Sequence, residues 1–316
     1  MKQRILITGA TGFVGKQLVV QLMKPNCELF LLVRSGCASA FADLDVNVIE
    51  HASIEQYRGQ ELPEKLDCII HLVAKAHVTE KEQNRAEYER VNVAGTQALC
   101  DVARRLQVSH FIYLSSIKVN ADATSAGPIS EHSQPEPTGV YAETKFAAEQ
   151  LAQGLVEDGI RVSVVRPPLV YGGGVKANMA ALVKLVKWLP ILPFGRIANK
   201  RSFLSVRNLC DFIMTLAFKE PQQHYNSEVF IVSDGEAFST AQLCQTIAKG
   251  MNKQPIMLNI SVAFLSTITR LLGLQAMWSK LTSSLHVSGV NPQQYYQWTP
   301  PFAASEEIAA LTKEAN

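Results

Sequence analysis

The sequence predicts an α/β fold in which a doubly wound parallel sheet is followed by a smaller C-terminal lobe. Through the first half of the chain, short apolar runs alternate with stretches that repeat apolar residues at helical spacing. This alternation is the pattern of βαβ units. After Pro167 it gives way to proline-rich turns and the triplet Gly172-Gly173-Gly174. The change of pattern predicts that a second unit begins near residue 167.

Each expected element follows from its periodicity. Six apolar runs have the length of buried strands, and they cover residues 4–8, 28–33, 46–49, 68–73, 111–115 and 162–166. Helical spacing is found over residues 16–23, 89–106 and 141–158. Further along, residues 208–218 predict a helix and residues 228–232 a strand, and both can pack back on the first unit. The window 256–274 predicts an amphipathic surface or lid helix, with membrane association as the alternative.

Composition excludes several classes of protein. The chain has 316 residues, 47% of them hydrophobic, with 30 Lys and Arg against 28 Asp and Glu and a net charge of +2. This is enough apolar material for a large core and too little charge for a disordered chain. A nucleic-acid binder would show a basic stripe rather than near-balanced charge. We therefore expect a small-molecule substrate and no nucleic-acid partner.

The cysteines and the N-terminal residues indicate the cellular compartment in which the protein is expected. The six cysteines lie far apart, with no CxxC pair and no Cys/His cluster at ligand spacing. They are expected to behave as small apolar residues in a reducing compartment, with no metal site. The apolar run before Gly9 is too short for a signal peptide, and no uninterrupted run reaches ~20 residues. The sequence thus predicts a cytoplasmic protein without a transmembrane segment.

The strongest motif is a glycine-rich turn between the first strand and the first helix. Gly9, Gly12 and Gly15 occur there in the order GxxGxxG, with Thr11 beside them and Phe13 and Val14 opening the helix. Glycines allow a tight turn and close approach of backbone N–H groups to a pyrophosphate. A plain strand-to-helix turn is the alternative. The motif predicts a Rossmann-type dinucleotide-binding domain over 1–166. Residues 167–316 are then mainly a substrate-binding lobe, with parts of 202–235 packing back on the first domain.

The end of the second strand bears on the choice of cofactor. Many NAD enzymes place an acid there for the ribose 2′-hydroxyl, whereas this chain has Arg34. An arginine suits a 2′-phosphate, which favours NADP(H) over NAD(H). Arg34 can also stack on the adenine or lie in solvent.

Three residues predict proton and hydride chemistry. Ser116 follows the fifth strand, and Tyr141 and Lys145 are spaced to share one face of a helix. An ammonium close to a phenol lowers the pKa of the phenol. Such a tyrosine can exchange a proton with a substrate hydroxyl while hydride moves at the same carbon. The pair is common by chance, so its place after the glycine motif and the serine strand is what makes it informative.

Together these motifs, with the segment from Arg166 through Tyr171 to Gly172, resemble an extended short-chain dehydrogenase/reductase of the NAD-dependent epimerase/dehydratase family. The resemblance extends from Arg4 to the segment 298–301. It implies that Tyr141 is the acid/base, that Lys145 binds the nicotinamide ribose and tunes Tyr141, and that Ser116 hydrogen-bonds the reacting oxygen.

The resemblance also implies further contacts. Leu72, Ala74 and Pro168 would line the cofactor, Leu72 and Ala74 by packing only. Asn92 would lie near the substrate, with a helix-packing role as the alternative. Asn178 and Arg201 would contact the diphosphate of a UDP-sugar, with a solvated cation as the alternative for Arg201.

Departures from the family pattern narrow the reaction. Sugar 4,6-dehydratases carry an Asp-Glu pair where this chain has Ile117 and Lys118, so dehydration is not expected. Relatives often carry an acid after the third strand that contacts the adenine of the cofactor. This chain has the sequence Glu-His-Ala-Ser at residues 50–53 instead, so this adenine contact is not expected.

The chain is similar both to 4-ketoreductases that form UDP-N-acetylquinovosamine for surface polysaccharides such as lipopolysaccharide and to UDP-hexose 4-epimerases. Arg34 favours the reductase by a small margin. A non-catalytic dinucleotide-binding regulator and a plain interaction domain are the alternatives from other classes. The resemblance also implies a homodimer, for which Phe146, Ala147, Leu151 and Leu155 are a candidate face or simply core.

Overall fold

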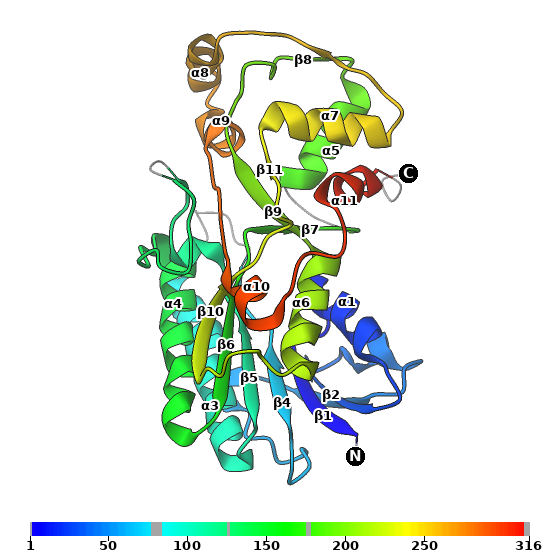
Figure 1. Ribbon diagram of the computed structural model, residues 1–316, viewed down its shortest axis with the longest axis vertical. Helices are drawn as coiled ribbons and strands as arrows, with labels where there is room; N and C mark the ends of the chain where they lie inside the picture. The colour runs from blue at the N-terminus through cyan, green and yellow to red at the C-terminus, as the bar shows by residue number, and fades with distance from the viewer. Residues whose placement is uncertain (1, 77–83, 125–126, 175–177, 313–316) are drawn as a thin grey trace.

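The protein is built on a seven-stranded parallel sheet (Figure 1). The computed structural model describes residues 2–76, 84–124, 127–174 and 178–312, without the side chain of Asn178. The sheet order is β10-β6-β5-β4-β1-β2-β3. Its strands are β1 (Gln3–Thr8), β2 (Cys27–Arg34), β3 (Asn47–His51), β4 (Cys68–His71), β5 (His110–Leu114), β6 (Arg161–Arg166) and β10 (Ser227–Ile231). The predicted α/β fold with a doubly wound parallel sheet is confirmed.

Helices cover both faces of this sheet because its strands are apolar on both faces. Ile5 and Ile7 of β1 pack in one cluster with α1 (Phe13–Leu22) and α6 (Val206–Phe218). Leu6 packs on the other face with α3 (Gly95–Leu106) and α4 (Gly139–Gln153). Side chains alternate along a strand, so a continuous apolar run buries both of its faces.

Shorter helical segments complete these layers. The helix α2 (Arg85–Tyr88) continues into a six-residue π-helix (Glu89–Ala94) ahead of α3, and a 3₁₀ turn (Gly154–Asp158) extends α4. Other 3₁₀ turns are Ala38–Phe41, Ile54–Gln56 and Ile117–Val119. Leu155 lies in the core, while Phe146, Ala147 and Leu151 are half-buried on α4.

The seventh strand comes from beyond residue 166. β10 pairs with β6 along the edge of the sheet, and α6 packs against α1. The helix α10 (Asn291–Tyr296) contacts β10, and the Trp298 ring lies 4.9 Å from the Phe212 ring, centroid to centroid. The sheet therefore contains one strand more than the six expected from the first half of the sequence.

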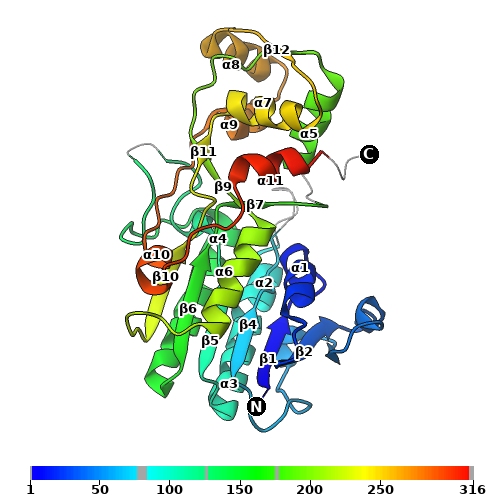
Figure 2. The ribbon, with the colours of Figure 1, turned by 45° about the vertical axis from the view of Figure 1, so that its right-hand side comes forward.

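The rest of the chain forms a smaller part beyond the carboxyl ends of the strands (Figures 1 and 2). It contains a three-stranded sheet, β11-β9-β7, and a two-stranded one, β12-β8. The strands are β7 (Leu169–Tyr171), β8 (Ile191–Leu192), β9 (Arg201–Ser205), β11 (Ala237–Phe238) and β12 (Ile256–Met257). The helices are α5 (Asn178–Trp188), α7 (Thr240–Gly250), α8 (Val262–Leu271), α9 (Gln275–Thr282) and α11 (Ala304–Ala310).

The expectation of one helix over residues 256–274 is wrong, because this window contains β12, a connection and the separate helix α8. Within the described ranges, no helix has the length and apolar character needed to cross a bilayer. All six cysteines are free thiols, and five of them are buried.

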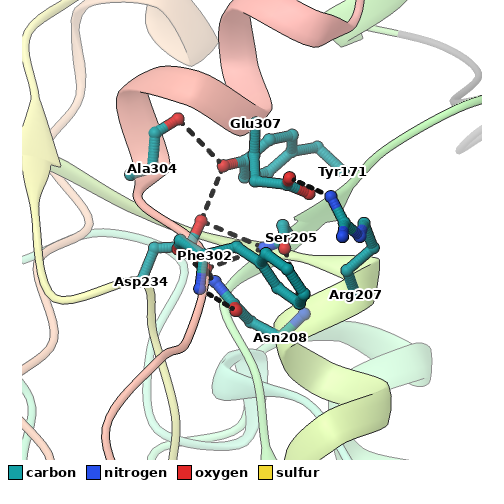
Figure 3. A network of polar contacts seen from close by, with 8 residues as sticks. All are labelled: Tyr171, Ser205, Arg207, Asn208, Asp234, Phe302, Ala304 and Glu307. Carbon is teal, nitrogen blue, oxygen red and sulfur yellow. Dashed lines mark hydrogen bonds and ion pairs between the residues drawn. The ribbon is translucent and has the colours of Figure 1, made fainter.

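A buried carboxylate joins the smaller part to the main sheet's helices (Figure 3). Asp234 accepts hydrogen bonds from the Tyr171 hydroxyl at 2.7 Å, the Ser205 N–H at 2.9 Å and the Asn208 amide at 2.7 Å. Asn208 also binds the backbone of Phe302 in both directions. This network fixes β7, the start of α6 and the segment before α11 relative to one another.

Candidate active site

The candidate residues lie where the sheet changes its direction of winding. From β1 the chain proceeds to β2 and β3 on one side, whereas from β4 it proceeds to β5 and β6 on the other. In such sheets, a crevice opens at the carboxyl ends of the two strands that flank this point. Here these are β1, which ends at Thr8, and β4, which ends at His71. The glycine turn follows β1, and the Ser115-Ser116 pair follows the neighbouring β5.

The glycine turn has the geometry needed for a dinucleotide. Gly9 has φ +75°, which favours glycine, and its carbonyl accepts a hydrogen bond from the Gly12 N–H at 2.9 Å. A Cβ on Gly15 would lie 2.1 Å from the Gly9 oxygen, so only glycine allows α1 to start this close. The first turn of α1 carries no acid, and its N-terminal N–H groups are available to an anion. These residues therefore fit the pyrophosphate of NAD(H) or NADP(H).

Other residues of the same turn lie on its accessible side. Gly12 and Phe13 are exposed, and Thr11 and Val14 are half-buried. Gly9 lies against the segment after β4, because a Cβ there would come within 3.3 Å of the Leu72 Cβ. The turn and the end of β4 thus border one another, as a shared cofactor site requires.

The remaining predicted cofactor residues lie at or just after the carboxyl ends of β2, β4 and β6. Leu72 and Ala74 are half-buried after β4, and Pro168 is buried between β6 and β7. Arg34 is exposed at the carboxyl end of β2 beside His51 of β3. Burial lowers the pKa of His51, and the positive charge of Arg34 lowers it further. An exposed guanidinium in this position can meet a 2′-phosphate or an adenine, and the preference for NADP(H) stays a prediction.

The two serines after β5 face different partners. Ser115 is buried and donates a hydrogen bond to the Glu149 carboxylate. Ser116 is half-buried and shares a hydrogen bond with the Tyr141 phenol. Ser116 also accepts from the Lys118 N–H at 3.3 Å, which caps the turn that follows β5. Ser116 and Tyr141, two of the residues singled out in the sequence, therefore lie next to one another.

The pKa of Tyr141 moves in the direction opposite to the one expected. Burial raises it, and the hydrogen bond with Ser116 opposes that effect. The Lys145 ammonium instead donates to the Leu114 carbonyl at 2.7 Å and lies 4.1 Å from the centroid of the Tyr113 ring. Lys145 is turned toward β5, and in this arrangement it does not depress the pKa of the phenol.

Lys145 has an unusual protonation equilibrium. The residue is 1% exposed, and burial lowers its pKa to about 7, while the charge of Glu149 raises it. A lysine in water stays protonated far above neutral pH. The ammonium therefore gains or loses its proton within the physiological range, which is a property of functional lysines.

Sequence reasoning missed the acid that supports Lys145. Glu149 is fully buried one turn further along α4 and accepts hydrogen bonds from Arg166 at the end of β6, at 3.1 Å and 3.2 Å from Nε and 2.5 Å from Nη2. Arg166 also donates to the Asn120 side chain at 3.1 Å. The spacing of four residues between Lys145 and Glu149 on an otherwise apolar helix face was an available signal.

Asn92 joins two of the site's elements. It lies in the π-helix, is 1% exposed, and accepts a hydrogen bond from the Lys75 N–H at 2.7 Å. Its amide donates to the Lys75 carbonyl at 3.3 Å and to the Thr144 hydroxyl at 3.0 Å. Both amide hydrogens are thus used to tie the loop after β4 to α4. This bonding is the helix-packing role named as the alternative, and a substrate contact stays a prediction.

The two expected diphosphate residues lie in the smaller part. Asn178 begins α5, but its side chain is outside the described part of the chain. Arg201 begins β9, and its Nη1 donates to the carbonyls of Lys280 at 3.0 Å and Ser283 at 3.2 Å. Burial lowers the pKa of Arg201. Its described hydrogen bonds all use Nη1, and their acceptors are neutral oxygens, so a phosphate contact also stays a prediction.

Comparison with known proteins gives a consistent assignment. Residues 5–231 match the model of the family described as NAD dependent epimerase/dehydratase. The chain is 35% identical over 313 residues to the UDP-glucose 4-epimerase of Vibrio cholerae, which covers 97% of this chain and 93% of that protein. It is 30% identical to the GDP-6-deoxy-D-mannose reductase of Pseudomonas aeruginosa, over 78% of this chain and 80% of that protein.

Solved structures agree on the fold. The UDP-glucuronic acid 4-epimerase of Bacillus cereus in complex with NAD superposes with a TM-score of 0.78 at 18% identity, covering 99% of this chain and 98% of that one. RMD of Pseudomonas aeruginosa complexed with NADPH has a TM-score of 0.72 at 22% identity, with 100% of both chains covered.

Proposed function

The chain belongs to the NAD dependent epimerase/dehydratase family, and on that premise we propose that it carries out hydride transfer at C4 of a UDP-linked hexose. The net reaction proposed is 4-epimerisation, because a relative that matches nearly the whole chain at 35% identity is a UDP-glucose 4-epimerase. The motifs alone favoured a 4-ketoreductase by a small margin, and this similarity reverses that order.

One observation carries the proposal. The Tyr141 phenol shares a hydrogen bond with Ser116, and Lys145 lies one helical turn away from Tyr141 with a pKa of about 7. Ser116 follows β5, and Tyr141 and Lys145 lie in α4; the glycine turn lies at the same end of the sheet, where its strands terminate. A hydroxyl pair and a titrating ammonium beside a dinucleotide turn are what alcohol–ketone interconversion needs.

In the proposed reaction, each of the candidate residues has a separate role. The turn from Gly9 to Gly15 holds the diphosphate of NAD(H), which when bound accepts a hydride and returns it. Tyr141 takes the proton of the C4 hydroxyl as C4 is oxidised to the ketone, and gives it back when C4 is reduced from the opposite face. Ser116 donates a hydrogen bond to the C4 oxygen throughout. Arg201 and Asn178 bind the UDP diphosphate from the smaller part.

A 4-ketoreductase is the second candidate, and two observations favour it. The raised pKa of Tyr141 keeps the phenol protonated, as a donor to a ketone oxygen must be. Arg34 is exposed at the end of β2, where it suits NADPH. The substrate would be a UDP-linked 4-keto-6-deoxy N-acetylhexosamine.

A two-part assay decides between the candidates. Purified protein is incubated with UDP-glucose or UDP-GlcNAc without added cofactor, and separately with the 4-keto-6-deoxy derivative of UDP-GlcNAc plus NADPH. We expect the C4 epimer in the first reaction. Oxidation of NADPH in the second, without epimer in the first, would assign the reductase instead.

The acid/base assignment predicts the behaviour of Tyr141→Phe. Loss of the phenolic oxygen removes the proton acceptor and donor, so we expect turnover to fall by about 10²–10⁴-fold. Binding of the cofactor, measured by calorimetry, should remain within about twofold of the original. The matched control is Tyr57→Phe, because the Tyr57 hydroxyl is buried without a hydrogen-bond partner among the described residues. Near-normal turnover in Tyr141→Phe would remove this residue from the reaction.

A further inference from the structure

The end of the smaller part farthest from the main sheet carries an unusual amount of exposed apolar surface. The helix α8 has no buried residue, and Phe264 and Leu271 lie seven residues apart on one of its faces with exposed fractions of 60% and 81%. Leu272 follows at 66%. Figures 1 and 2 both place α8 at the extreme end of the molecule, away from the seven-stranded sheet.

The apolar surface continues onto the neighbouring strands. Ile191 of β8 pairs in register with Ile256 of β12, and both side chains are exposed. Trp188, at the end of α5, is 75% exposed and borders a hollow of about 410 Å³ that Lys253 and Pro255 also line. We call the set Trp188, Ile191, Ile256, Phe264, Leu271 and Leu272 the distal apolar surface. Exposed patches of this kind mark interaction sites.

The chain around the distal apolar surface has charges of one sign only. Residues 159–210 and 237–305 contain no Asp or Glu, and these two segments supply α5, β8, β12, α8 and α9. The exposed cations of these segments include Lys184, Lys253, Arg270 and Lys280, and Lys253 lines the same hollow as Trp188. The net charge of +2 for the whole chain thus conceals a basic end.

We propose that the distal apolar surface docks on an anionic lipid bilayer. Aromatic and aliphatic side chains ringed by lysine and arginine are the combination that peripheral proteins use to sit in the interfacial region of a negatively charged membrane. The cations attract the anionic headgroups, and Phe264, Leu271 and Trp188 enter the boundary between headgroups and acyl chains.

A second copy of this chain is a poorer occupant. A twofold dimer through this surface would place each patch against its own image. Lys253, Arg270 and the other cations of this end would then be brought together across the interface, with no carboxylate from these segments to neutralise them. A bilayer supplies the missing negative charge and adapts to side chains from the four elements α5, β8, β12 and α8. Docking by this end also keeps the bilayer away from the seven-stranded sheet (Figure 1).

Vesicle co-sedimentation of the full chain tests the proposal. The probes are vesicles of phosphatidylcholine alone and vesicles with phosphatidylglycerol added. We expect binding to the anionic vesicles to be at least about tenfold tighter than to the neutral ones, and to weaken in high salt. Phe264→Ser/Leu271→Ser should reduce binding to anionic vesicles by about tenfold, and Lys253→Gln/Arg270→Gln by a similar factor.

The controls change the same residue types elsewhere. Val20→Ser removes an exposed apolar side chain from α1, and Lys65→Gln/Lys219→Gln removes two exposed lysines outside this end. Both should bind anionic vesicles like the original, and circular dichroism confirms that every variant is folded. Absence of binding, equal binding to neutral vesicles, or loss of binding in the controls would overturn the proposal. So would a dimer in sedimentation velocity that Phe264→Ser/Leu271→Ser abolishes.

Discussion

The charge of Lys145 depends on a carboxylate one turn further along α4. Burial lowers the pKa of Lys145 to about 7, and Glu149 acts against that effect. Below this pH the ammonium is present, and above it the neutral amine prevails. We therefore expect steps that need the Lys145 cation to weaken as the pH rises through neutrality. Glu149 is a positioning residue for the site, since it acts on the reaction only through Lys145.

The variant Glu149→Gln tests this role. Removing the negative charge lowers the pKa of Lys145, so the alkaline limb of the pH profile of kcat/KM should move to lower pH by about one pH unit. Stability should fall by about 3–5 kcal/mol, because Arg166 is left as an unpaired buried cation. The control is Glu143→Gln, which changes an exposed acid on the same helix. A loss of stability with an unmoved alkaline limb would reduce Glu149 to a structural role.

Sequence reasoning singled out Tyr141 and Ser116 but did not predict their electrostatics. The two residues could be singled out because the proposed chemistry requires those residue types at fixed places in the order of elements. The direction of the Tyr141 pKa shift was not predictable, because it depends on how deeply the phenol is buried and on where the Lys145 ammonium points. Neither quantity is encoded in a spacing of four residues. The bonding of Asn92 could not be predicted for the same reason, since its partner Lys75 lies far away in the sequence, in the loop after β4.

At the scale of elements, the start of α1 is determined by the glycine turn. A Cβ on Gly15 would come 2.1 Å from the Gly9 oxygen and 2.7 Å from the Ala10 Cα, both backbone atoms that cannot rotate away. Helix and turn must therefore separate if any side chain is added. The contact between Gly15 and the backbone of Gly9 and Ala10 therefore has two effects. It shapes the site for the phosphates, and it allows α1 to pack on β1.

Gly15→Ala should therefore affect binding and stability together. We expect the free energy of unfolding, measured with urea, to fall by about 1–3 kcal/mol from overpacking. Affinity for the cofactor, measured by calorimetry, should fall at least about tenfold. Gly154→Ala is the matched control, because its Cβ would meet nothing within 4 Å and its φ is not positive. It should be neutral or stabilising by up to about 1 kcal/mol. Unchanged cofactor binding in Gly15→Ala would contradict this view of the turn.

The parallel strands were predictable, whereas the elements of the smaller part were not. Strands such as β1 and β2 are buried on both faces, which gives continuous apolar runs with edges sharp to within a residue or two. β8, β11 and β12 have two residues each, too few for any periodicity. The window 256–274 misled because its apolar residues suggested a single amphipathic helix, although β12 and α8 share it and both expose apolar side chains.

At the scale of the whole molecule, Asp234 holds the two parts together (Figure 3). Burial raises the pKa of this carboxyl, and the hydrogen bonds from Asn208, Tyr171 and Ser205 lower it. Asp234 thus serves as the shared acceptor for donors from three separate residues. The junction it forms sets the position of Arg201 and α5 relative to the edge of the main sheet.

Asp234→Ala should loosen this junction. Buried donors on Tyr171, Ser205 and Asn208 lose their acceptor, so we expect a loss of about 3 kcal/mol or more in the free energy of unfolding. Arg207→Gln is the control from the same network, because the Arg207 side chain is 48% exposed and its ion pair with Glu307 contributes about 1 kcal/mol or less. Urea titration followed by tryptophan fluorescence measures both. Equal effects of the two variants would show that Asp234 is not the centre of the junction.

The late position of β10 in the chain has a consequence for synthesis. When the ribosome has released residues 1–166, six strands can pair, but β6 still presents a row of unsatisfied backbone groups along Val162–Arg166. These groups form their hydrogen bonds with β10 only after residue 231 has left the ribosome, because residues 167–226 must be translated first. A nascent chain is therefore exposed to edge-to-edge association during this interval. A fragment that stops at residue 166 should aggregate for the same reason.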